Sequence, residues 1–576
     1  MSAPVLFLVP ARAGSRRVPA KNLRTVGGIP LVGWAVRSAR LAAARLDGGP
    51  HVVACSTDDP AIAAAAMAWG ADRVLERPAH LAGDAASSYD VAIHALDALD
   101  PDRDRFASFV LVQPTSPLTQ PSDLRAAIER LEAGAPSVVS VTPSHPAGWH
   151  MGFARGGGDR LVPAAAGGGH LLTGAIYAAR TDVLREARRF VADGTVGLSV
   201  LPERSIDIDE EHDFPIAEAF LAARPVRPVP VGDRSIGEGA VFVIAEVGVN
   251  HDGDPERAHR LIDVVAESGA DAVKFQTFDP AALVAAGAPT AEYQRASAGA
   301  GEDQLALLGR LALPADAWAG LQGHAVERGL VFLSTPFDDG SADLLAGLGV
   351  PAFKIGSGEL TNLPFLERLA RRGRPLLVST GMADMVEVAA AIDAIGGAGD
   401  PPVALLHCVS SYPAEAADAN LRAIDTMRRA FGVPVGWSDH TPGVELPLAA
   451  VAVGAALVEK HVTTDRSLPG PDHRASLEPA ELTAMVAGIR AIEAALGSGV
   501  KVPVSAERPI AAVARRSLHW RRSLEPGSVV AADDLAALRP GTGISPARQP
   551  EVVGRTVVRA VVAGSAVDPA DLEAVR

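Results

Sequence analysis

The sequence predicts an α/β protein made of a doubly wound α/β domain, a (β/α)8 barrel and a small β-rich domain. With 576 residues, the chain is too long for a single hydrophobic core. Strand-like runs alternate with helix-length segments over most of it. Two proline-containing stretches, RPVRPVPVGDRS and GSGVKVPVSAERP, interrupt this alternation, and closely spaced prolines favour an extended linker. We therefore predict domains at 1–223, 236–500 and 515–576, joined by linkers at 224–235 and 501–514.

Composition restricts the partners and the compartment. A net charge of −15 argues against nucleic-acid binding, so an anionic substrate has to be held by local clusters of Arg and Lys. No run of about 18 apolar residues predicts a membrane span. The start, MSAPVLFLVPAR, lacks the basic leader of a signal peptide. Cys55 and Cys408 are the only cysteines, which predicts no disulfide framework and favours a cytoplasmic location.

Residues 5–46 have the order of a phosphate-binding α/β site. The apolar run VLFLVP (5–10) is followed by the basic, glycine-containing loop ARAGSRRVPAKN and then by the helix-like PLVGWAVRSARLAAARL. The loop is neither a Walker A motif nor GxGxxG. Further strands are predicted at 51–56, 109–114 and 138–143, as in a doubly wound parallel sheet. A solvated surface turn stays open as the alternative for the loop.

The segment SIDIDEEHDF predicts a cation site. In a strand, Asp207 and Asp209 point to the same side, and two such carboxylates repel each other unless a cation lies between them. Mg²⁺ is the ion held by one or two carboxylates plus substrate phosphates. The alternative is a solvated edge strand.

Five blocks of this part resemble the N-acylneuraminate cytidylyltransferases (CMP-sialic acid synthetases): VPARAGSRRVPAKNL, STDD, RPAHLAGDAASS, LVQPTSPL and SIDIDEEHDF. The resemblance implies sugar contact near Gln113 and Mg²⁺ on Asp207 and Asp209. It implies catalytic roles for Arg12 and Lys21 within a CTP site formed by Arg12, Ser15, Arg16, Lys21, Asn22, Arg77, Ser87 and Ser88. The chain departs from the usual pattern at Ala13, Arg16 and Thr173.

The second domain contains the strand count of a TIM barrel. Eight apolar runs are separated by helix-length segments over roughly 250 residues. These runs are 241–250, 272–277, 331–336, 352–357, 376–381, 403–408, 433–440 and 457–462. Each begins apolar and ends polar, and in a barrel all these ends meet at the rim where catalytic groups lie. The polar ends are Glu246, Asn250, Lys274, Gln276, Thr335, Lys354, Ser357, Ser379, His407, Ser438, His440, Lys460 and His461.

The residue types at this rim predict its chemistry. Two lysines with several hydroxyls suit a phosphate or phosphoenol group; these residues are Lys274, Lys354, Thr335, Ser357, Ser379 and Ser438. His440 and His461 suit Mn²⁺ or Zn²⁺ with open positions for substrate, although a hydrogen-bonded wall histidine is the alternative for each. Glu246, Glu359 and Asp472 could bind sugar hydroxyls or transfer protons.

This region resembles the sialic acid synthases in IAEVGVNHDG, VKFQTF, LSTPFD, KIGSGEL, STGM, LHCVSSYPA, GWSDHT and EKHVTTDRSLPGPDH. The resemblance implies condensation of phosphoenolpyruvate with N-acetylmannosamine, giving a nine-carbon 2-keto acid and phosphate. It implies that the lysines and hydroxyls named above hold phosphoenolpyruvate and that His440 and His461 hold a divalent metal such as Mn²⁺. The sugar would face Glu246, Gln276, Glu359, Tyr412 and Asp472, and Ser410 stands where some members have Asn.

The C-terminal part resembles the antifreeze-like (SAF) domain that ends sialic acid synthases, through RRSLEPGSVVAADDLAALRPGTGISP and the β-like VVGRTVVRAVVAGSAV. So small a unit buries little surface alone. The resemblance implies a domain-swapped homodimer or a higher homo-oligomer in which Arg539 reaches the sugar site of the other subunit.

Together these features predict a bifunctional transferase. The barrel would make N-acetylneuraminate, and the N-terminal domain would activate it with CTP to CMP-N-acetylneuraminate and pyrophosphate. Three alternatives stay open: the same reactions on a legionaminic, pseudaminic or deaminated acid, an active synthase with a non-catalytic N-terminal binding module, and a non-enzymatic carbohydrate-binding protein. A 6-phosphorylated sugar also stays open as the substrate.

Overall fold

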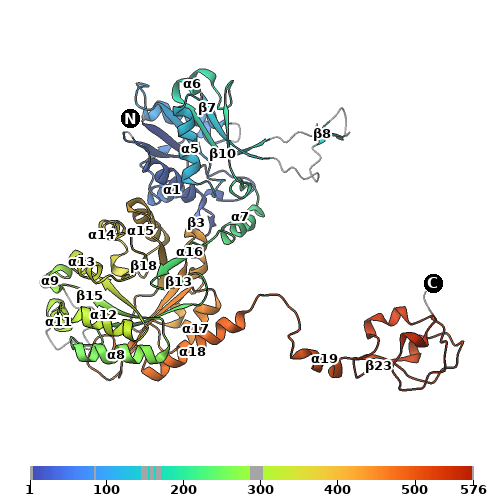
Figure 1. The fold of residues 1–576 in the computed structure, drawn as a ribbon. Coiled ribbons are helices and arrows are strands. Elements are labelled where there is room, and N and C mark those ends of the chain that lie inside the picture. Colours follow the sequence, from blue (N-terminus) through green and yellow to red (C-terminus); the bar gives the residue numbers. More distant parts are fainter. Residues whose placement is uncertain are drawn as a thin grey trace. The chain divides into compact units, whose positions relative to one another are not determined.

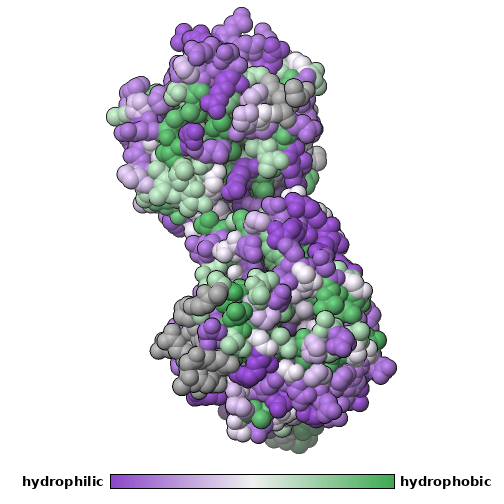
Figure 2. Space-filling view, turned by 90° about the vertical axis from the view of Figure 1, so that its left-hand side faces the viewer, coloured by the Kyte–Doolittle hydropathy of each residue, from purple (hydrophilic) through white to green (hydrophobic). Residues whose placement is uncertain are grey.

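The structure, a computed structural model, describes residues 4–47, 49–83, 86–143, 153–155, 161–163, 170–285, 288 and 303–573. Asp84 and Ala85 of the RPAHLAGDAASS block lie outside these ranges. The chain divides into two compact units, residues 1–495 and 496–576. No helix in the described ranges is both long enough and apolar enough to cross a membrane. On the face drawn in Figure 2, hydrophilic and hydrophobic residues are interspersed.

The N-terminal domain is built on a seven-stranded sheet of order β11-β7-β10-β6-β1-β4-β5. Strand β1 (Val5–Pro10) pairs in parallel with β4 (Val52–Thr57) and β6 (Ser108–Val112), as predicted. Strand β7 (Ser137–Pro143) is also confirmed. However, β10 (His170–Arg180) runs antiparallel to both β6 and β7, so the prediction of an all-parallel sheet is wrong at this strand. An alternating sequence pattern shows which residues face inward but does not encode strand direction.

Helices cover both faces of this sheet (Figure 1). Val5, Phe7 and Val9 of β1 belong to one apolar cluster, whereas Leu6 and Leu8 belong to another on the opposite face. This alternation confirms the doubly wound layering. The remaining elements are β2 (Thr25–Val26), β3 (Ile29–Pro30), α1 (Leu31–Ala43), α2 (Pro60–Ala68), β5 (Arg73–Glu76), α3 (Ala79–Ala82), α4 (Ser88–Leu99), α5 (Pro121–Glu132), β8 (Phe153–Arg155), β9 (Leu161–Pro163), α6 (Thr181–Ala187), β11 (Val196–Ser199) and α7 (Asp213–Ala222).

The segment that carries Asp207 and Asp209 is not a strand. Residues 205–209 are irregular, and α7 begins at Asp213, so the predicted strand is wrong. Ile208 is buried, and its N–H donates a 2.8 Å hydrogen bond to the carbonyl of Thr115. One such bond anchors the segment, but no neighbouring strand supplies the ladder that a strand requires.

The second domain is a closed barrel of eight parallel strands surrounded by helices (Figure 1), and all eight predicted strands are confirmed. Apart from β16 and β17, consecutive strands pair in parallel, and β14 pairs with β21 to join the first and last strands. Strands β16 and β17 lie next to each other and complete the ring. The strands are β14 (Phe242–Gly248), β15 (Ala272–Thr277), β16 (Val331–Pro336), β17 (Phe353–Ile355), β18 (Leu376–Ser379), β19 (Val403–Cys408), β20 (Val435–Asp439) and β21 (Leu457–His461).

The helices of the barrel are α8 (Pro255–Ser268), α9 (Pro280–Leu283), α11 (Gln304–Leu311), α12 (Ala317–Glu327), α13 (Asp339–Leu348), α14 (Leu363–Ala370), α15 (Met385–Ala398), α16 (Ala423–Phe431), α17 (Glu445–Ala452) and α18 (Pro479–Leu496). They enclose the main apolar cluster between themselves and the outward-facing strand residues, for example Val243, Phe275 and Trp437. A short 3-10 helix, Ser357–Glu359, follows β17 and brings its two polar end residues to the carboxyl end of the barrel.

The predicted linker 224–235 is in part a hairpin, so the prediction is wrong for its second half. Strands β12 (Val229–Val231) and β13 (Arg234–Ile236) pair antiparallel. Val229, Val231 and Ile236 are fully buried in the same cluster as the first residues of the barrel strands, so the hairpin closes the amino-terminal end of the barrel. The prolines permit this because each strand of a two-stranded ribbon has one edge that needs no N–H donor.

Helix α1 of the N-terminal domain contacts α15 of the barrel within the first unit. Arg37 forms a two-pronged ion pair with Asp393, with distances of 2.5 Å from Nη2 and 3.0 Å from Nε, and both side chains are largely buried. Arg429 of α16 approaches Glu218 of α7 at 3.4 Å. Ala389 and Ala430 of the barrel belong to the apolar cluster of the N-terminal domain. The two domains therefore share a packed contact in addition to their covalent connection.

Reversing either charge of the Arg37–Asp393 pair should lower the free energy of unfolding by about 1–3 kcal/mol, because a partly buried charge would face a like charge. The double reversal R37D/D393R should recover most of this loss, since the opposite charges would meet again. Urea unfolding of the two single variants and the double variant measures the coupling. An additive double variant would contradict the expectation.

The second unit is small and irregular. Its core includes Leu518, Trp520 and Val557, around the short pair β22 (Ser517–Trp520) and β23 (Leu535–Leu538). The predicted linker 501–514 contains helix α19 (Glu507–Ala514), so it is wrong as an extended linker for these residues. The run ERPIAAVA has its proline near the helix start, where proline is tolerated, and alanines after it that favour a helix.

Candidate functional sites

A cavity of about 470 Å³ lies at the carboxyl ends of β1 and β6 in the N-terminal domain. Its lining is strongly cationic, with Asp209 as the carboxylate among the described lining residues. Lys21 Nζ donates to the carbonyl of Ile208 at 2.8 Å and to Asp209 Oδ1 at 3.1 Å. The lining residues are Pro10, Arg12, Ser15, Arg16, Arg17, Lys21, Asn22, Gln113, Pro114, Thr115 and Asp209. A phosphate chain would find complementary charge here.

Most of the predicted nucleotide residues meet in this cavity, but three do not line it. Arg77 is buried, and its guanidinium donates to Ser56 Oγ at 3.1 Å and to the Ser56 carbonyl at 2.6 Å. Ser87 caps α4 by accepting a 3.1 Å hydrogen bond from the Asp90 N–H, and Ser88 begins that helix. Arg17 lines the cavity and lies 3.6 Å from Asp209, although the prediction passed over it.

The Asp207–Asp209 pair has the donor chemistry of a Mg²⁺ site. The pKa of Asp207 is raised, first by loss of hydration and also by the charge of Asp209, against a hydrogen bond from Thr115. Two hard carboxylates close enough to repel each other suit a cation that is completed by substrate phosphates. Within the described ranges, no group of three or more His, Cys, Asp or Glu side chains could hold a metal without such help.

A second cavity, of about 630 Å³, opens at the carboxyl ends of the barrel strands. It brings together nearly all site residues predicted for this domain. The predicted residues that line it are Glu246, Lys274, Gln276, Thr335, Lys354, Ser357, Glu359, Ser379, Ser410, Tyr412, Ser438, His440, His461 and Asp472. Arg539 belongs to the second unit, where it is exposed and directly follows β23.

The floor of this cavity is a buried cluster of two lysines and two glutamates. Lys274 Nζ lies 2.9 Å from Glu246 Oε1 and 3.8 Å from Glu459 Oε2, and it donates to Thr335 Oγ1 at 3.2 Å. Lys354 Nζ donates to Ser379 Oγ at 2.7 Å and lies 3.5 Å from Glu459 Oε1. All four charged side chains are almost completely buried. Compensation within the cluster keeps these charges in the barrel interior.

The neighbours split the pKa values of the two glutamates. Burial raises the pKa of Glu246, and the charge of Glu459 adds to this effect against the attraction of Lys274. Burial also acts on Glu459, but the charges of Lys274 and Lys354 outweigh it and lower its pKa. Two carboxyl groups whose pKa values differ in this way can play different roles, one staying ionised and the other able to hold a proton.

Glu459 was missed by the sequence prediction, which instead named its neighbour Lys460. Side chains alternate along β21, so Glu459 and His461 face the cavity while Lys460 points to the other side. There Lys460 is fully buried and ion-paired with Asp439. His407 likewise lies outside the cavity lining and hydrogen-bonds to the carbonyl of Ala419 at 2.9 Å. Strict alternation, counted back from His461, would have found Glu459.

His440 and His461 lie together at the ends of β20 and β21, with ring centroids 5.5 Å apart. His440 Nδ1 donates to the carbonyl of Val409 at 2.8 Å, so in the neutral form of this ring Nε2 is the nitrogen without a proton. His461 Nδ1 is buried without a hydrogen-bond partner, 4.0 Å from Asp472 Oδ2. Burial and the charge of His440 lower the pKa of His461 well below its usual value. A neutral imidazole with an unpartnered nitrogen fits a metal ligand.

One side of the cavity is apolar, which the sequence did not predict. Its side chains come from the segment after β15, from α9 and from α11, and we call them the apolar wall: Phe278, Leu283, Val284, Leu308 and Leu311. Phe278 and Leu311 pack with Val249 and Leu307. Apart from its histidines, the described lining has Lys274 and Lys354 as its cations, and both lie in the floor cluster.

Comparisons with known proteins identify all three domains in the predicted order. Residues 6–146 match the cytidylyltransferase family, residues 261–501 the NeuB family and residues 515–573 the SAF domain. The predicted fusion of these domains is therefore confirmed.

Several named relatives match about half of this chain. N,N'-diacetyllegionaminic acid synthase from Legionella pneumophila subsp. pneumophila is 46% identical over 328 residues, or 56% of this chain and 92% of that protein. The synthase of the same name from Campylobacter jejuni subsp. jejuni is 41% identical over 320 residues, or 55% of this chain and 96% of that protein. N-acetylneuraminate-9-phosphate synthase from Mus musculus is 38% identical over 272 residues, or 46% of this chain and 74% of that protein. The chain therefore belongs to the NeuB family and carries a cytidylyltransferase domain before its synthase barrel.

Proposed function

We propose that the protein makes a nine-carbon 2-keto sugar acid in its barrel and activates it with CTP in its N-terminal domain. The observation that carries this proposal is the presence of two separate cavities with matching chemistry. One combines a buried lysine pair with two histidines, and the other has a cationic lining that includes Asp209. The proposed condensation needs a site for phosphoenolpyruvate and an aldehyde, which the barrel cavity would provide. The proposed activation needs a site for a triphosphate, which the N-terminal cavity would provide.

In the barrel, Lys274 and Lys354 would bind the phosphate and carboxylate of phosphoenolpyruvate, with hydroxyls from Thr335, Ser357, Ser379 and Ser438 completing the cradle. The enol carbon then bonds to the aldehyde carbon of the sugar, water adds at the phosphate-bearing carbon, and the tetrahedral intermediate breaks its C–O bond to release phosphate. Glu246 faces the sugar end and has a raised pKa, which supports a role in proton transfer. Glu359 is the second carboxylate proposed for this end.

His440 and His461 would hold the divalent ion, Mn²⁺ in the proposal, which when bound supplies Lewis-acid polarisation of the sugar aldehyde. Tyr412 packs against His440 with ring centroids 4.0 Å apart and ring planes tilted by 37°, and so helps to orient that ring. Gln276 donates to Glu246 at 2.9 Å, which positions this carboxylate toward the sugar end. Glu459 lies 3.8 Å from Lys274 and 3.5 Å from Lys354, and its negative charge favours the charged form of both buried lysines.

In the N-terminal domain, Arg12, Ser15, Arg16 and Lys21 would bind the triphosphate of CTP, with Asn22 and Gln113 beside the nucleotide and the sugar acid. The anomeric hydroxyl of the acid attacks the α-phosphate, and pyrophosphate leaves. Mg²⁺ on Asp207 and Asp209 would supply charge neutralisation on the phosphates. Arg77, Ser87 and Ser88 keep their proposed place near the nucleotide on family resemblance alone.

N-acetylmannosamine is the sugar proposed first. A second candidate, the six-carbon diacetamido sugar that would give an N,N'-diacetyllegionaminic acid, is favoured by the apolar wall and by the two relatives of that name. Methyl groups of acetamido substituents can pack on such a wall, whereas a sugar phosphate would need cations there. The wall therefore supports an unphosphorylated sugar.

The SAF domain is proposed to complete the sugar site of a second subunit through Arg539, in a domain-swapped dimer. Cys55 and Cys408 are both buried free thiols, which supports the proposed cytoplasmic location.

One assay tests both activities. Purified protein is incubated with phosphoenolpyruvate, CTP, Mn²⁺, Mg²⁺ and one of three sugars: N-acetylmannosamine, its 6-phosphate or the diacetamido sugar. Phosphate and pyrophosphate are quantified separately. We expect both products with an unphosphorylated sugar and neither without one. Phosphate without pyrophosphate would instead leave the N-terminal domain as a binding module, and release only with the 6-phosphate would overturn the role of the apolar wall.

A further inference from the structure

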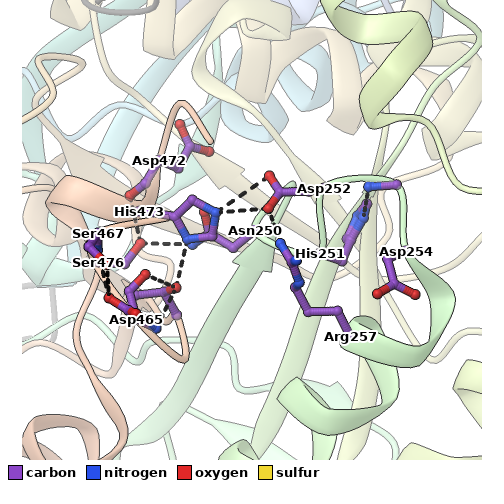
Figure 3. Close-up of polar contacts among 12 residues, drawn as sticks. Asn250, His251, Asp252, Asp254, Arg257, Asp465, Ser467, Asp472, His473 and Ser476 are labelled. Carbon is purple, nitrogen blue, oxygen red and sulfur yellow. Dashed lines mark hydrogen bonds and ion pairs between the residues drawn. The ribbon is translucent and has the colours of Figure 1, made fainter. Parts of the chain in front are cut away.

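The loop after β21 connects His461 and Asp472, which both line the barrel cavity. It leaves the barrel after His461 and carries Asp472, which lines the cavity. Its ends are joined by backbone hydrogen bonds, from Thr463 N–H to the Leu477 carbonyl at 2.9 Å and from Leu477 N–H to the His461 carbonyl at 2.8 Å. Figure 3 shows His473 of this loop in contact with Asp252 in the turn that follows β14.

His473 is the centre of these contacts and is completely buried. Its Nε2 lies 3.2 and 3.4 Å from the two carboxylate oxygens of Asp252, and its Nδ1 lies 2.6 Å from Thr463 Oγ1 (Figure 3). Because a carboxylate only accepts hydrogen bonds, Nε2 must donate to Asp252. Asp252 also pairs with Arg257 of α8. The ring of His473 is therefore held at both nitrogens, by Asp252 after the first barrel strand and by Thr463 after the last one.

Asn250 makes the second connection. Its amide nitrogen donates to the carbonyl of Val462 at 2.9 Å and to Ser476 Oγ at 2.8 Å. Ser476 Oγ in turn donates to the carbonyl of Asp472 at 2.7 Å. One buried amide thus holds the residue next to His461 and, through one hydroxyl, the backbone of Asp472.

None of Asn250, Asp252 and His473 is among the described residues that line the cavity, so these three side chains lie behind the site. The donors named here, on Asn250, His473 and Ser476, all have acceptors, whereas Asn250 Oδ1 is buried without a hydrogen-bond partner. Buried hydrogen bonds of this kind favour one arrangement of their groups, which makes them suited to holding a loop in place. Here it ties the turn after β14 to both ends of the segment that carries Asp472. The spacing between Asp472 and His461, 4.0 Å from Oδ2 to Nδ1, depends on this segment.

We propose that Asp252, His473 and Asn250 are positioning residues that set Asp472 against His461 at the sugar end of the site. That the affected ligand is the sugar rests on the proposed function. Loss of the network should therefore weaken use of the sugar more than use of phosphoenolpyruvate, because none of its three side chains contacts Lys274 or Lys354, which are proposed to bind phosphoenolpyruvate.

The test compares Asp252→Asn with Asp271→Asn, a matched control at the opposite end of the barrel. Asp271 is also buried, and its Oδ2 accepts from Arg490 at 2.7 Å and from the Val243 N–H at 2.8 Å. Both variants remove a carboxylate charge from a partly buried ion pair, so both should lose thermal stability. We expect D252N to raise the KM for the sugar at least about tenfold with the KM for phosphoenolpyruvate within about twofold. D271N should leave both KM values unchanged.

Hydrogen–deuterium exchange gives an answer that does not require turnover. Amides of residues 463–477 should exchange faster in D252N and in His473→Leu than in D271N, while His473→Gln, which keeps a donor toward Asp252, should recover part of the protection. Unchanged exchange in this loop would overturn the inference even if the wild type releases no phosphate. If the wild type is active, an unchanged KM for the sugar in D252N would overturn it as well. Absence of phosphate release by the wild type itself counts against the proposed function alone.

Discussion

Replacing Lys274 by methionine is expected to remove phosphate release almost completely, with a fall in kcat/KM of about 10²–10³-fold. The ammonium group is the cation closest to Glu246 and also faces Glu459, and it is proposed to bind the anionic substrate. Without it, two buried carboxylates lose their shared partner, which should lower the free energy of unfolding by about 3–5 kcal/mol. Initial rates of phosphate release and urea unfolding measure the two effects.

Lys460→Met is the matched control for this substitution. Lys460 is as deeply buried as Lys274 and is also ion-paired, but with Asp439 on the side away from the cavity. The control should therefore lose stability while its KM for phosphoenolpyruvate changes little. The double variant K274M/E246Q should regain stability, since one uncompensated charge is gone, and should stay inactive. Substantial phosphate release by a folded K274M protein would show that this lysine does not hold phosphoenolpyruvate.

Replacing Asp209 by alanine should lower pyrophosphate release by about 10²-fold or more and leave phosphate release unchanged. Asp209 is the carboxylate in the lining of the N-terminal cavity, and it contacts Lys21 and Arg17. Its loss removes a proposed Mg²⁺ ligand and frees two cations that would then hold the triphosphate in a different place. Parallel assays of the two products in one sample measure this separation.

Glu211→Ala is the control for the lost charge. Glu211 is two residues further along, pairs with Arg24 at 2.9 Å and does not line the cavity. Pyrophosphate release should be unaffected by this change. If D209A and E211A behave alike, the segment acts through its overall charge. If D209A keeps full pyrophosphate release, the N-terminal cavity does not use this aspartate as proposed.

Apolar runs that end in polar residues were enough to place most of the candidate site in the barrel. The eight strand runs were all confirmed, because a parallel strand that is buried on both faces needs a continuous apolar stretch, and its polar end marks the rim. Lys274, Lys354, His440 and His461 were found by this rule. The rule failed at Lys460. It assigned both Lys460 and His461 to the cavity, but adjacent residues of a strand point to opposite sides, and Lys460 is paired with Asp439 instead.

The hairpin at 229–236 shows a different limit. Its prolines predicted an extended linker, but Val229, Val231 and Ile236 are buried against the amino-terminal end of the barrel. Burial of these side chains depends on an apolar opening that forms only when eight distant strands close. The conformational propensity of the segment does not predict this burial, because the favourable free energy comes from contact with the barrel strands and not from the segment itself.

The amino-acid sequence by itself determined the three domains, their order and the residue types that gather at the two sites, because these follow from local periodicity and from motifs. Only the tertiary structure decided that Glu459 sits between the two lysines, that an apolar wall closes one side of the barrel cavity, and that His473 meets Asp252. Each of these contacts joins residues from different strands or loops. Their pairing is set by barrel closure and by the direction in which each side chain leaves its strand, and neither is encoded in a single stretch of chain.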